Sequence, residues 1–393
     1  MRPAASRLGA TVKLMKHRVK ILWMSDPPTF FTGFGTVTKE ILTRLIGTER
    51  YQIACLGWGY NGWPYDRQEI PFDIYPSNNP NLNPDTLAKV VEEYQPHIVI
   101  TLGDIWMVDW IVDLPNRSKF KFVPYFPLDG EPLYPPWGKF IRDADVPVTY
   151  SRFAQDVIQQ ALPDARVELI YHGVDTTVFQ PIKEHQRPAE LKNRFIVGCV
   201  ARNQPRKNLP TLIKAFARFC QNKPEAVLYL HTNPDDIGWD ILDLLKRYRV
   251  FDRTCISKSA SIQKALAKTK LNEIYNLFDV MVLPTAGEGF GLPILEAMAA
   301  GVPVIATNYS SCVELLEGRG ELIAVKEFLT AGRHNIEYAI PDIDDLVAKL
   351  DLLYTAPELR KEYSNSGVEF ARTLDWDEIV TRWDNLLMNV AQG

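Results

Sequence analysis

The 393-residue sequence has few cysteines, no long apolar run and little net charge. Its five cysteines are odd in number and widely spaced, which argues against a disulfide framework or a zinc site and favours reduced thiols. No apolar run reaches the roughly 18 residues of a membrane span. The net charge of −4 provides no overall attraction to nucleic acid or anionic lipid. These absences predict a cytoplasmic protein, with a peripheral position at a membrane surface as the alternative.

The N-terminal segment lacks acidic side chains and also lacks the long apolar core of a signal peptide. Its charged residues are all basic: Arg2, Arg7, Lys13, Lys16 and Arg18. We expect residues 1–18 to be a disordered basic tail. A weak contact with a membrane surface or with nucleic acid is the alternative.

From residue 19 onward, short apolar runs alternate with polar or helix-period segments. The first runs lie at residues 19–24, 53–56, 98–102, 120–126, 146–150 and 167–171. This alternation predicts an α/β protein with a parallel sheet covered by helices. A chain of this length exceeds what one core usually supports, which predicts two domains. The polar, proline-bearing residues 181–193 fit a hinge, so we place the domain boundary near residue 185.

The most informative stretch is residues 288–301, which read Glu-Gly-Phe-Gly-Leu-Pro-Ile-Leu-Glu-Ala-Met-Ala-Ala-Gly. Apolar runs at residues 280–284 and 302–306 flank it, which predicts a strand, a glycine loop, a short helix and a second strand. Pro293 suits the first helical position and Gly301 suits the position after the helix, where a positive φ is required. The N–H groups of Gly291 and Leu292 would then face an anion.

Two glutamates, Glu288 and Glu296, flank the glycine turn and could both reach the end of the preceding strand. Carboxylates do not bind phosphates, but they accept hydrogen bonds from hydroxyl groups. A ligand with both phosphates and hydroxyls is a nucleotide sugar. The alternative is that Glu296 only complements the helix dipole, which contributes about 0.3–1 kcal/mol, and that Glu288 is solvated.

Two further segments carry features of an anion site. Residues 32–38 read Thr-Gly-Phe-Gly-Thr-Val-Thr, but Thr38 replaces the third glycine of a dinucleotide loop, which disfavours a nicotinamide enzyme. After the apolar run at 195–200, Arg202, Arg206 and Lys207 precede a helical pattern, where they could meet an anion. Solvated charges at a helix entry are the alternative.

Glu288, the residues Gly289 to Pro293 that follow, and Glu296 together resemble the paired-glutamate signature of retaining glycosyltransferases of the GT-B fold, the family 4 group or glycosyl transferases group 1. The segment at residues 170–181 is similar to the H-G-V-D…F-x-P element that ends the N-terminal domain in that family. The resemblance covers about residues 19–390. It implies two Rossmann-like domains facing each other across a cleft. The N-terminal domain (19–185) takes the acceptor, the C-terminal domain (186–374) takes the donor, and a helix (375–393) crosses back to the N-terminal domain.

The resemblance also implies roles for individual residues. Glu288 would contact the transferred sugar and Glu296 the ribose, while Arg202 and Lys207 would bind the diphosphate. Glu314 would help to close the pocket, with a first-turn helix acid as the alternative. The full set of donor-binding residues that we predict is Gly33, Gly35, Arg202, Lys207, Phe290, Gly291, Leu292, Glu296 and Glu314.

The sequence departs from the family near residues 126–132, where many members carry an essential histidine and this chain has none. We predict that Asp129 acts in its place beside Glu288, with Asp104 as the second candidate and turn aspartates as the alternative. Two D-x-D patterns, at residues 342–344 and 375–377, lie at predicted helix starts, where capping is the simpler explanation. We therefore predict no metal site.

Six of the nine tryptophans lie in the first 140 residues: Trp23, Trp58, Trp63, Trp106, Trp110 and Trp137. Several occupy glycine- and proline-rich loops and could form an acceptor platform, with plain loop packing as the alternative. Flat rings stack on sugars, nucleobases and lipid-like groups alike, so the acceptor could be a saccharide, a lipid-linked sugar, a protein, a small aglycone or a modified nucleobase.

The resemblance implies a metal-independent hexosyltransferase (EC 2.4) that moves a sugar from a UDP- or GDP-sugar to an acceptor hydroxyl with retention of configuration. No other cofactor is expected. A nucleotide-sugar epimerase or a GT-B phosphorylase is the alternative, and a non-catalytic nucleotide-sugar-binding protein is less favoured.

Overall fold

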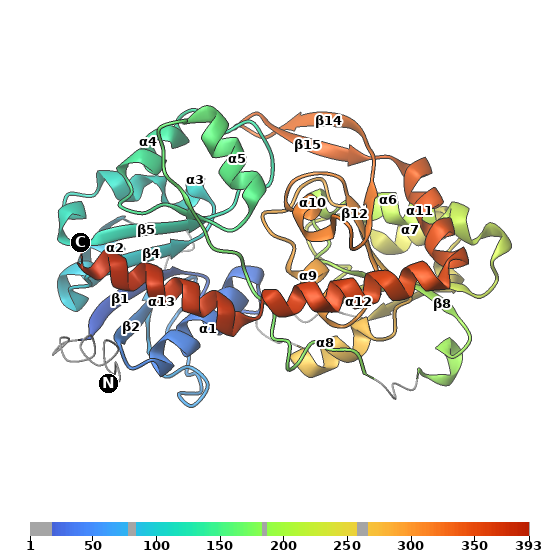
Figure 1. Cartoon of the computed structure of the whole chain (residues 1–393), viewed down its shortest axis with the longest axis horizontal. Helices are drawn as coiled ribbons and strands as arrows, with labels where there is room; N and C mark the ends of the chain where they lie inside the picture. The colour runs from blue at the N-terminus through green and yellow to red at the C-terminus, as the bar shows by residue number, and fades with distance from the viewer. Residues whose placement is uncertain (1–17, 78–83, 183–186, 258–265, 393) are drawn as a thin grey trace, which may run out of the picture.

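The computed structural model describes residues 18–77, 84–182, 187–257 and 266–392. Residues 1–17 of the predicted tail and the predicted boundary at residues 185 and 186 lie outside the described residues. Two α/β domains lie side by side, each built on a parallel sheet, as Figure 1 shows. The predicted fold class of two sheet domains covered by helices is thus confirmed.

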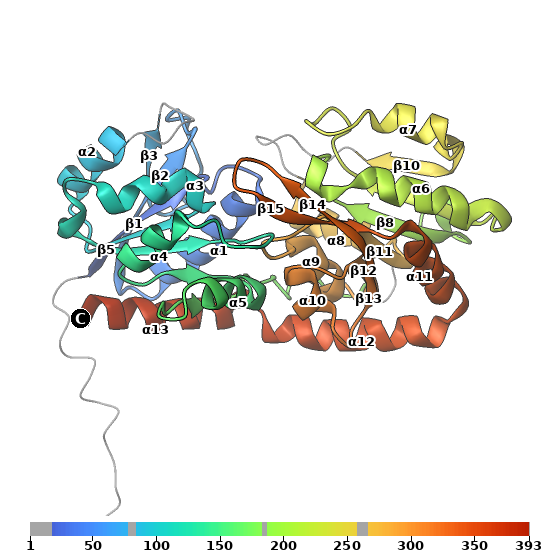
Figure 2. The same cartoon turned by 90° about the horizontal axis from the view of Figure 1, so that it is seen from above.

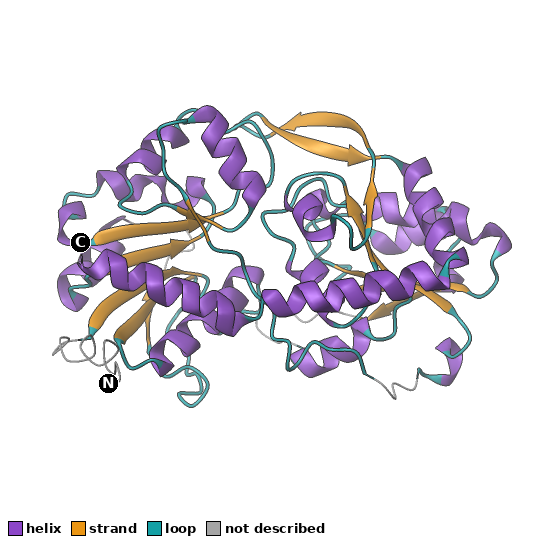
Figure 3. Cartoon of the chain, in the orientation of Figure 1, coloured by secondary structure: helices purple, strands orange, loops and turns teal. Residues whose placement is uncertain are grey.

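The N-terminal domain contains a seven-stranded sheet in the order β3-β2-β1-β4-β5-β6-β7. Its strands are β1 (Val19–Ser25), β2 (Tyr51–Trp58), β3 (Asp73–Ser77), β4 (Ile98–Leu102), β5 (Lys121–Phe126), β6 (Val148–Thr149) and β7 (Glu168–Leu169). Its helices are α1 (Gly33–Gly47), α2 (Pro84–Tyr94), α3 (Ile105–Val108), α4 (Trp137–Asp143) and α5 (Arg152–Ala161). Figure 3 shows these helices around the sheet.

The central strand β1 explains why the apolar runs are continuous. Ile21 and Trp23 belong to one hydrophobic cluster, whereas Leu22 and Met24 belong to a second one. Both faces of a parallel sheet are covered, so successive residues must all be apolar. Strand β3 was not among the predicted runs, because it is a short edge strand with exposed Asp73 and a proline, Pro76.

The C-terminal domain contains a six-stranded sheet in the order β10-β9-β8-β11-β12-β13. Its strands are β8 (Phe195–Val200), β9 (Ala226–His231), β10 (Thr254–Ser257), β11 (Val280–Leu283), β12 (Val304–Thr307) and β13 (Glu321–Ile323). Its helices are α6 (Leu209–Phe219), α7 (Ile241–Arg247), α8 (Lys268–Tyr275), α9 (Leu292–Ala299), α10 (Ser311–Leu316) and α11 (Ile343–Thr355). Because β8 and β11 are parallel neighbours, the residues that follow them meet at one edge of the sheet.

A hairpin of β14 (Val325–Ala331) and β15 (Ile336–Pro341) joins the two domains on one side and is visible at the top of Figure 1. The backbone N–H of Glu337 donates to the carbonyl of Glu131, 2.7 Å away in the N-terminal domain. The hairpin was not predicted, because most of β14 is exposed and its sequence lacks an apolar run.

Two C-terminal helices, α12 (Pro357–Thr373) and α13 (Trp376–Gln392), run in succession along one side of both domains (Figures 1 and 2). Helix α13 packs on the N-terminal domain, as predicted. Its Trp383 is fully buried against Trp23 and Tyr125, with ring centroids 6.0 and 4.9 Å apart. Within the described ranges, no helix combines the length and apolar character that crossing a bilayer requires.

Candidate active site between the domains

Two glycine loops face each other where the domains meet. A Cβ atom on Gly33, at the start of α1, would lie 3.9 Å from Cδ1 of Leu292, at the start of α9. Gly35 has no room for a side chain, because a Cβ there would lie 2.2 Å from the carbonyl oxygen of Phe30. The hydroxyl of Thr32 caps α1 by accepting from the N–H of Gly35 at 3.0 Å. The structure therefore brings together the two loops that the sequence singled out.

Glycines at both ends of α9 adopt a positive φ, and that of Gly301 was predicted. Gly291 has a φ of 100° and Gly301, after the helix, has a φ of 76°, values that favour glycine. Pro293 is the second helical residue rather than the first, because the helix begins at Leu292. The N–H of Leu292 therefore has no carbonyl within the helix to bind, and it lies at the positive end of the helix dipole.

Glu288 is buried and ion-paired with two cations. Its Oε1 lies 2.5 Å from Nζ of Lys207 and its Oε2 lies 3.0 Å from a guanidinium nitrogen of Arg206. Both cations come from η4 (Pro205–Lys207), the turn after β8. Burial alone would raise the pKa of Glu288, but Lys207 and Arg206 outweigh it and lower that pKa to about 2. Glu288 is therefore an anion at neutral pH, held in one position.

Arg206 is a site residue that the prediction did not include among the donor ligands. It also donates to the carbonyl of Gly287 at 3.0 Å, and its Nε lies 4.0 Å from Oδ2 of Asp129 in the other domain. Burial lowers its pKa, but Glu288 and Asp129 overcome that effect and raise the pKa above its ordinary value. The adjacent basic residues Arg206 and Lys207 were the sequence signal that could have predicted these contacts.

Arg202 lies apart from Lys207 and does not contact Glu288. Its guanidinium forms a two-pronged ion pair with Asp236, with N–O distances of 2.9 and 3.0 Å. Arg202 is 46% exposed, whereas Lys207 is buried. The roles of both residues in diphosphate binding stay predictions. To bind a diphosphate, the guanidinium of Arg202 would have to release Asp236 or bind both anions at once.

Glu296 is half-buried on α9, where it accepts a hydrogen bond of 2.7 Å from the hydroxyl of Tyr275. Burial raises the pKa of Glu296 to about 7, although Tyr275 and Lys268 oppose this shift. A carboxylate with one such partner has lone pairs left for ligand hydroxyls. Its predicted contact with a ribose stays a prediction.

The raised pKa of Glu296 predicts a pH-dependent stability. Between the ordinary value of 4.5 and about 7, the folded state holds a proton that the unfolded state has released, so stability falls as pH rises through this range. The Glu296→Gln variant lacks this ionisation. Urea unfolding at pH 5 and pH 7.5 should show a smaller loss of stability in the variant than in the wild type. Equal losses of stability in the two proteins would contradict a raised pKa at Glu296.

Asp129 faces the C-terminal domain at the end of β5. Its carboxylate lies 3.5 Å from the hydroxyl of Tyr338 on β15 and near Arg206. Burial, reinforced by the charge of Asp129, raises the pKa of the second candidate, Asp104, to about 6. Both aspartates thus belong to the N-terminal domain and lie near the cluster that Glu288 forms with Lys207 and Arg206. The catalytic role of Asp129 stays a prediction.

The domain contact beside Asp129 leaves no room for a side chain at Gly287. A Cβ there would lie 2.0 Å from the carbonyl oxygen of Asp129, a backbone atom. Gly287→Ala should separate the two halves of the site and lower the rate of the predicted reaction by about 10- to 100-fold, because small displacements of reacting groups are costly. Steady-state kinetics would measure this. Gly47→Ala is the matched control, because a Cβ there meets no atom within 4 Å, and equal activity of the two variants would contradict the prediction.

Phe290 and Glu314 both make contacts between the domains. The Phe290 ring is buried against His172, with centroids 5.1 Å apart. The Glu314 carboxylate accepts from the N–H groups of Arg152 and Phe153 at 3.0 and 3.2 Å, so it caps α5 of the N-terminal domain. Their predicted contacts with the donor stay predictions.

His172 was missed as a site residue, although it lies in the H-G-V-D element. It is buried, its Nδ1 lies 2.8 Å from the hydroxyl of Tyr125, and it stacks on Tyr150 with centroids 4.0 Å apart. Burial lowers the pKa of His172 to about 3. The ring is therefore neutral and contributes packing beneath Phe290.

The two D-x-D patterns cap helices. Asp342 accepts from the N–H groups of Asp344 and Asp345 at the start of α11, and Asp375 accepts from the N–H of Asp377 at the start of α13. Within the part of the chain that the structure describes, no group of three or more His, Cys, Asp or Glu side chains is placed to hold a metal ion.

Comparison with known sequences places the C-terminal half in a family. Residues 181–370 match the model of glycosyl transferases group 1. The MMP alpha-(1->4)-mannosyltransferase of Mycolicibacterium hassiacum is 25% identical over 234 residues, or 59% of this chain and 51% of that protein. The lipopolysaccharide core biosynthesis mannosyltransferase LpsB of Rhizobium meliloti is 28% identical over 216 residues, or 52% of this chain and 57% of that protein. The matches span about half the length of these curated relatives.

Solved structures match the whole described fold. Sucrose-phosphate synthase from Thermosynechococcus elongatus superposes with a TM-score of 0.75 at 19% identity, covering 95% of this chain and 99% of that one. The Anabaena protein HepE, in complex with UDP-glucose, superposes with a TM-score of 0.69 at 16% identity, covering 95% of this chain and 100% of that one. These likenesses confirm the predicted GT-B fold. Residues 181–370 thus match the glycosyl transferases group 1 family by sequence, and the described chain as a whole has the GT-B fold.

Proposed function

We propose that this protein is a retaining, metal-independent glycosyltransferase that moves a sugar from a nucleoside diphosphate sugar to an acceptor hydroxyl. The observation that carries this proposal is the cluster of Glu288, Lys207 and Arg206 at the N-terminal end of α9, opposite the glycine loop of the other domain. Fixed cations and a helix N-terminus suit a diphosphate, and a fixed carboxylate suits sugar hydroxyls.

The leaving diphosphate develops negative charge as the glycosidic bond breaks. Lys207, Arg202 and the N–H groups at Gly291 and Leu292 would stabilise this charge, which is the task that a metal ion performs in other transferases. Burial and the nearby Arg206 lower the pKa of Lys207, although Glu288 opposes them. A diphosphate at this position would restore a negative environment and favour the charged ammonium.

Retention is proposed to proceed by attack on the same face of the sugar, with a leaving-group oxygen helping to deprotonate the acceptor. Glu288 has a pKa of about 2 and both of its carboxylate oxygens are paired with cations. Such a carboxylate is a weak nucleophile, which supports a pathway without a covalent intermediate on this residue. Glu296 would hold the ribose.

A UDP- or GDP-sugar is the proposed donor. The structural neighbour HepE was solved with UDP-glucose, which supports the uridine nucleotide. Thermal shift with UDP, GDP and their sugars would identify the donor, because a ligand at 100 times its Kd stabilises a fold by about 2.7 kcal/mol.

The reaction is tested by following the donor and product by proton NMR in the presence of EDTA. With UDP-glucose and simple methyl glycosides, we expect the newly formed bond to keep the α configuration of the donor. A product of β configuration would exclude retention, and loss of all turnover with EDTA would exclude metal independence. Isomerised donor without acceptor would indicate an epimerase, and a requirement for phosphate would indicate a phosphorylase.

A further inference from the structure

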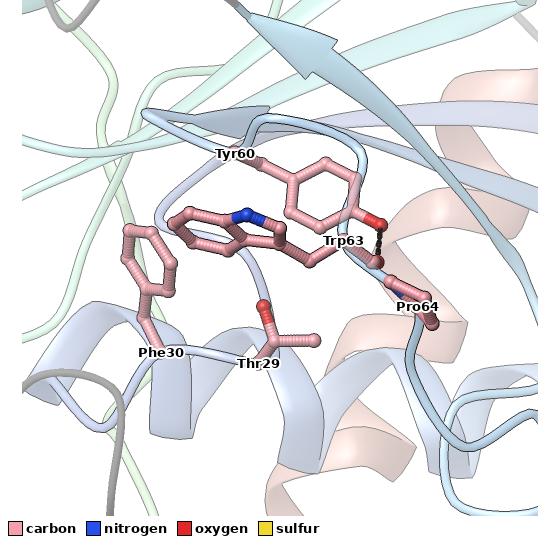
Figure 4. A pocket seen from close by; sticks show the side chains of 5 residues that line it. All are labelled: Thr29, Phe30, Tyr60, Trp63 and Pro64. Atoms are coloured by element: carbon pink, nitrogen blue, oxygen red, sulfur yellow. Dashed lines mark hydrogen bonds between the residues drawn. The ribbon is translucent and has the colours of Figure 1, made fainter.

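A small cavity lies in the N-terminal domain beside the glycine loop of α1. It has a volume of about 250 Å³ and is lined by Thr29, Phe30, Tyr60, Trp63 and Pro64 (Figure 4). Thr29 and Phe30 belong to the connection between β1 and α1, and the other three residues follow β2. Two separate loops therefore build this cavity.

The loop after β2 is held in one shape. The hydroxyl of Tyr60 donates to the backbone carbonyl of Trp63, as the dashed line in Figure 4 shows. Gly59 and Gly62 have φ values of 66° and 86°, so both turns require glycine. A Cβ on Gly57, at the end of β2, would lie 2.8 Å from the side chain of Pro27 and 3.0 Å from that of Tyr60, so the two connections are closely packed around the end of this strand. The cavity is thus preformed.

Among the loop aromatics that could have formed an acceptor platform, Trp63 offers an open ring at this cavity. It is 44% exposed, whereas Trp58 and Trp137 are buried in the core. Figure 4 shows the Trp63 ring between Phe30 and Tyr60, with its face turned to the side chain of Thr29. A partly exposed indole ring offers a stacking surface for the C–H groups of a sugar ring.

The hydroxyl of Thr29 is one of the polar groups that line the cavity. Its oxygen is buried and has no hydrogen-bond partner among the residues that the structure describes. In Figure 4 this oxygen points toward the Trp63 ring. Buried hydroxyls are normally hydrogen-bonded, so an unpaired one in a cavity indicates a ligand with hydroxyl groups.

The lining also excludes several ligand classes. None of the five residues is charged, whereas sites that follow a phosphate backbone combine aromatic rings with cations. The volume suits one or two rings rather than a long acyl chain. Phe30 precedes Gly33 by three residues, which span at most about 10 Å, and Gly33 faces Leu292 of the donor domain. The cavity therefore lies within reach of the proposed transfer site.

We propose that this cavity is a saccharide subsite, in which a neutral pyranose ring stacks on Trp63 and one of its hydroxyls binds Thr29. Its description as an acceptor subsite rests on the proposed function, but sugar binding itself does not. This inference narrows the acceptor to a molecule that carries at least one neutral sugar.

Direct binding of methyl α-D-glucopyranoside, maltose and cellobiose, measured by saturation-transfer NMR without any donor, tests the inference. We expect Trp63→Ala to raise the Kd of the bound sugar at least about 10-fold. Thr29→Val, which keeps the shape and removes the hydroxyl, should raise it about 5- to 10-fold. Trp63→Tyr should restore most of the affinity. Phe251→Ala is the matched control, because Phe251 is an aromatic residue that is also 44% exposed but lies on the donor domain.

The affinity for UDP, measured on the same variants, separates this inference from the proposed function. Unchanged UDP binding with weakened sugar binding supports the subsite. Absence of UDP binding in the wild type would count against the transferase, whereas the sugar titration still decides the subsite. No sugar binding, or equal sugar binding by wild type and Trp63→Ala, overturns the inference, as does Trp63-dependent binding of uridine or of an alkyl chain in place of the sugars.

Discussion

Replacing Glu288 by glutamine is expected to lower kcat/KM for sugar transfer by about 100- to 1,000-fold, the range for loss of one preorganised electrostatic group. The carboxylate compensates Lys207 and Arg206, with N–O distances of 2.5 and 3.0 Å. A neutral amide leaves Lys207 and Arg206 without the anion that neutralises them, so the charge that Lys207 presents at the proposed diphosphate position would be held less precisely. Steady-state kinetics with the donor that the thermal-shift screen identifies would measure the loss.

Glutamine is preferred to alanine because of burial. Removing one partner of a buried ion pair costs about 3–5 kcal/mol, and alanine would also leave a cavity. The amide oxygen of glutamine can still accept from Lys207, so the fold should persist, which circular dichroism and urea unfolding would check. Glu317→Gln, the same change at an exposed residue of the same domain, is the control. Activity of Glu288→Gln within a few-fold of this control would contradict the site assignment.

Replacing Trp383 by alanine is expected to lower the free energy of unfolding by about 3–5 kcal/mol, the usual cost of emptying a large aromatic position in a core. The ring is fully buried between α13 and the N-terminal sheet, against Trp23 and Tyr125. Its loss should detach α13 from the domain that it covers. Chemical denaturation and proteolysis near the C-terminus would measure both effects.

Asn385→Ala is the control for this second change, because Asn385 is exposed on the same helix. Ion pairs of α13 with Arg44 and Arg50 remain in both variants, but surface pairs usually contribute less than about 1 kcal/mol. We therefore expect them not to compensate for the lost ring. A Trp383→Ala protein as stable as the control would show that α13 is dispensable for the N-terminal domain.

Local features of the site were predictable because short segments encode them. Gly301 adopts the predicted positive φ, which few other residues tolerate. The strands were visible as apolar runs, since a parallel sheet buries both faces. Edge strand β3 and the exposed hairpin β14–β15 escaped prediction for the opposite reason, because neither buries enough apolar surface to show a run.

The charge pairing could not be predicted in the same way. Arg202 and Lys207 are close in sequence and were assigned one shared role, but the structure places Arg202 on Asp236 and Lys207 on Glu288. Arg206 was not among the predicted donor-binding residues, although it contacts Glu288 and approaches Asp129 of the other domain. The partners Asp236, Glu288 and Asp129 follow three different strands, β9, β11 and β5.

The sequence by itself determined the two sheet domains, the capped helix α9 and the identity of the residues around its glycine loop, because backbone preference and burial are set within short windows. Only the tertiary structure decided which cations neutralise Glu288, which acid pairs with Arg202 and which tryptophans stay exposed. The physical reason is separation along the chain: Lys207 and Glu288 are 81 positions apart, and Asp129 approaches Arg206 from the other domain. Such contacts depend on how whole sheets and loops pack together.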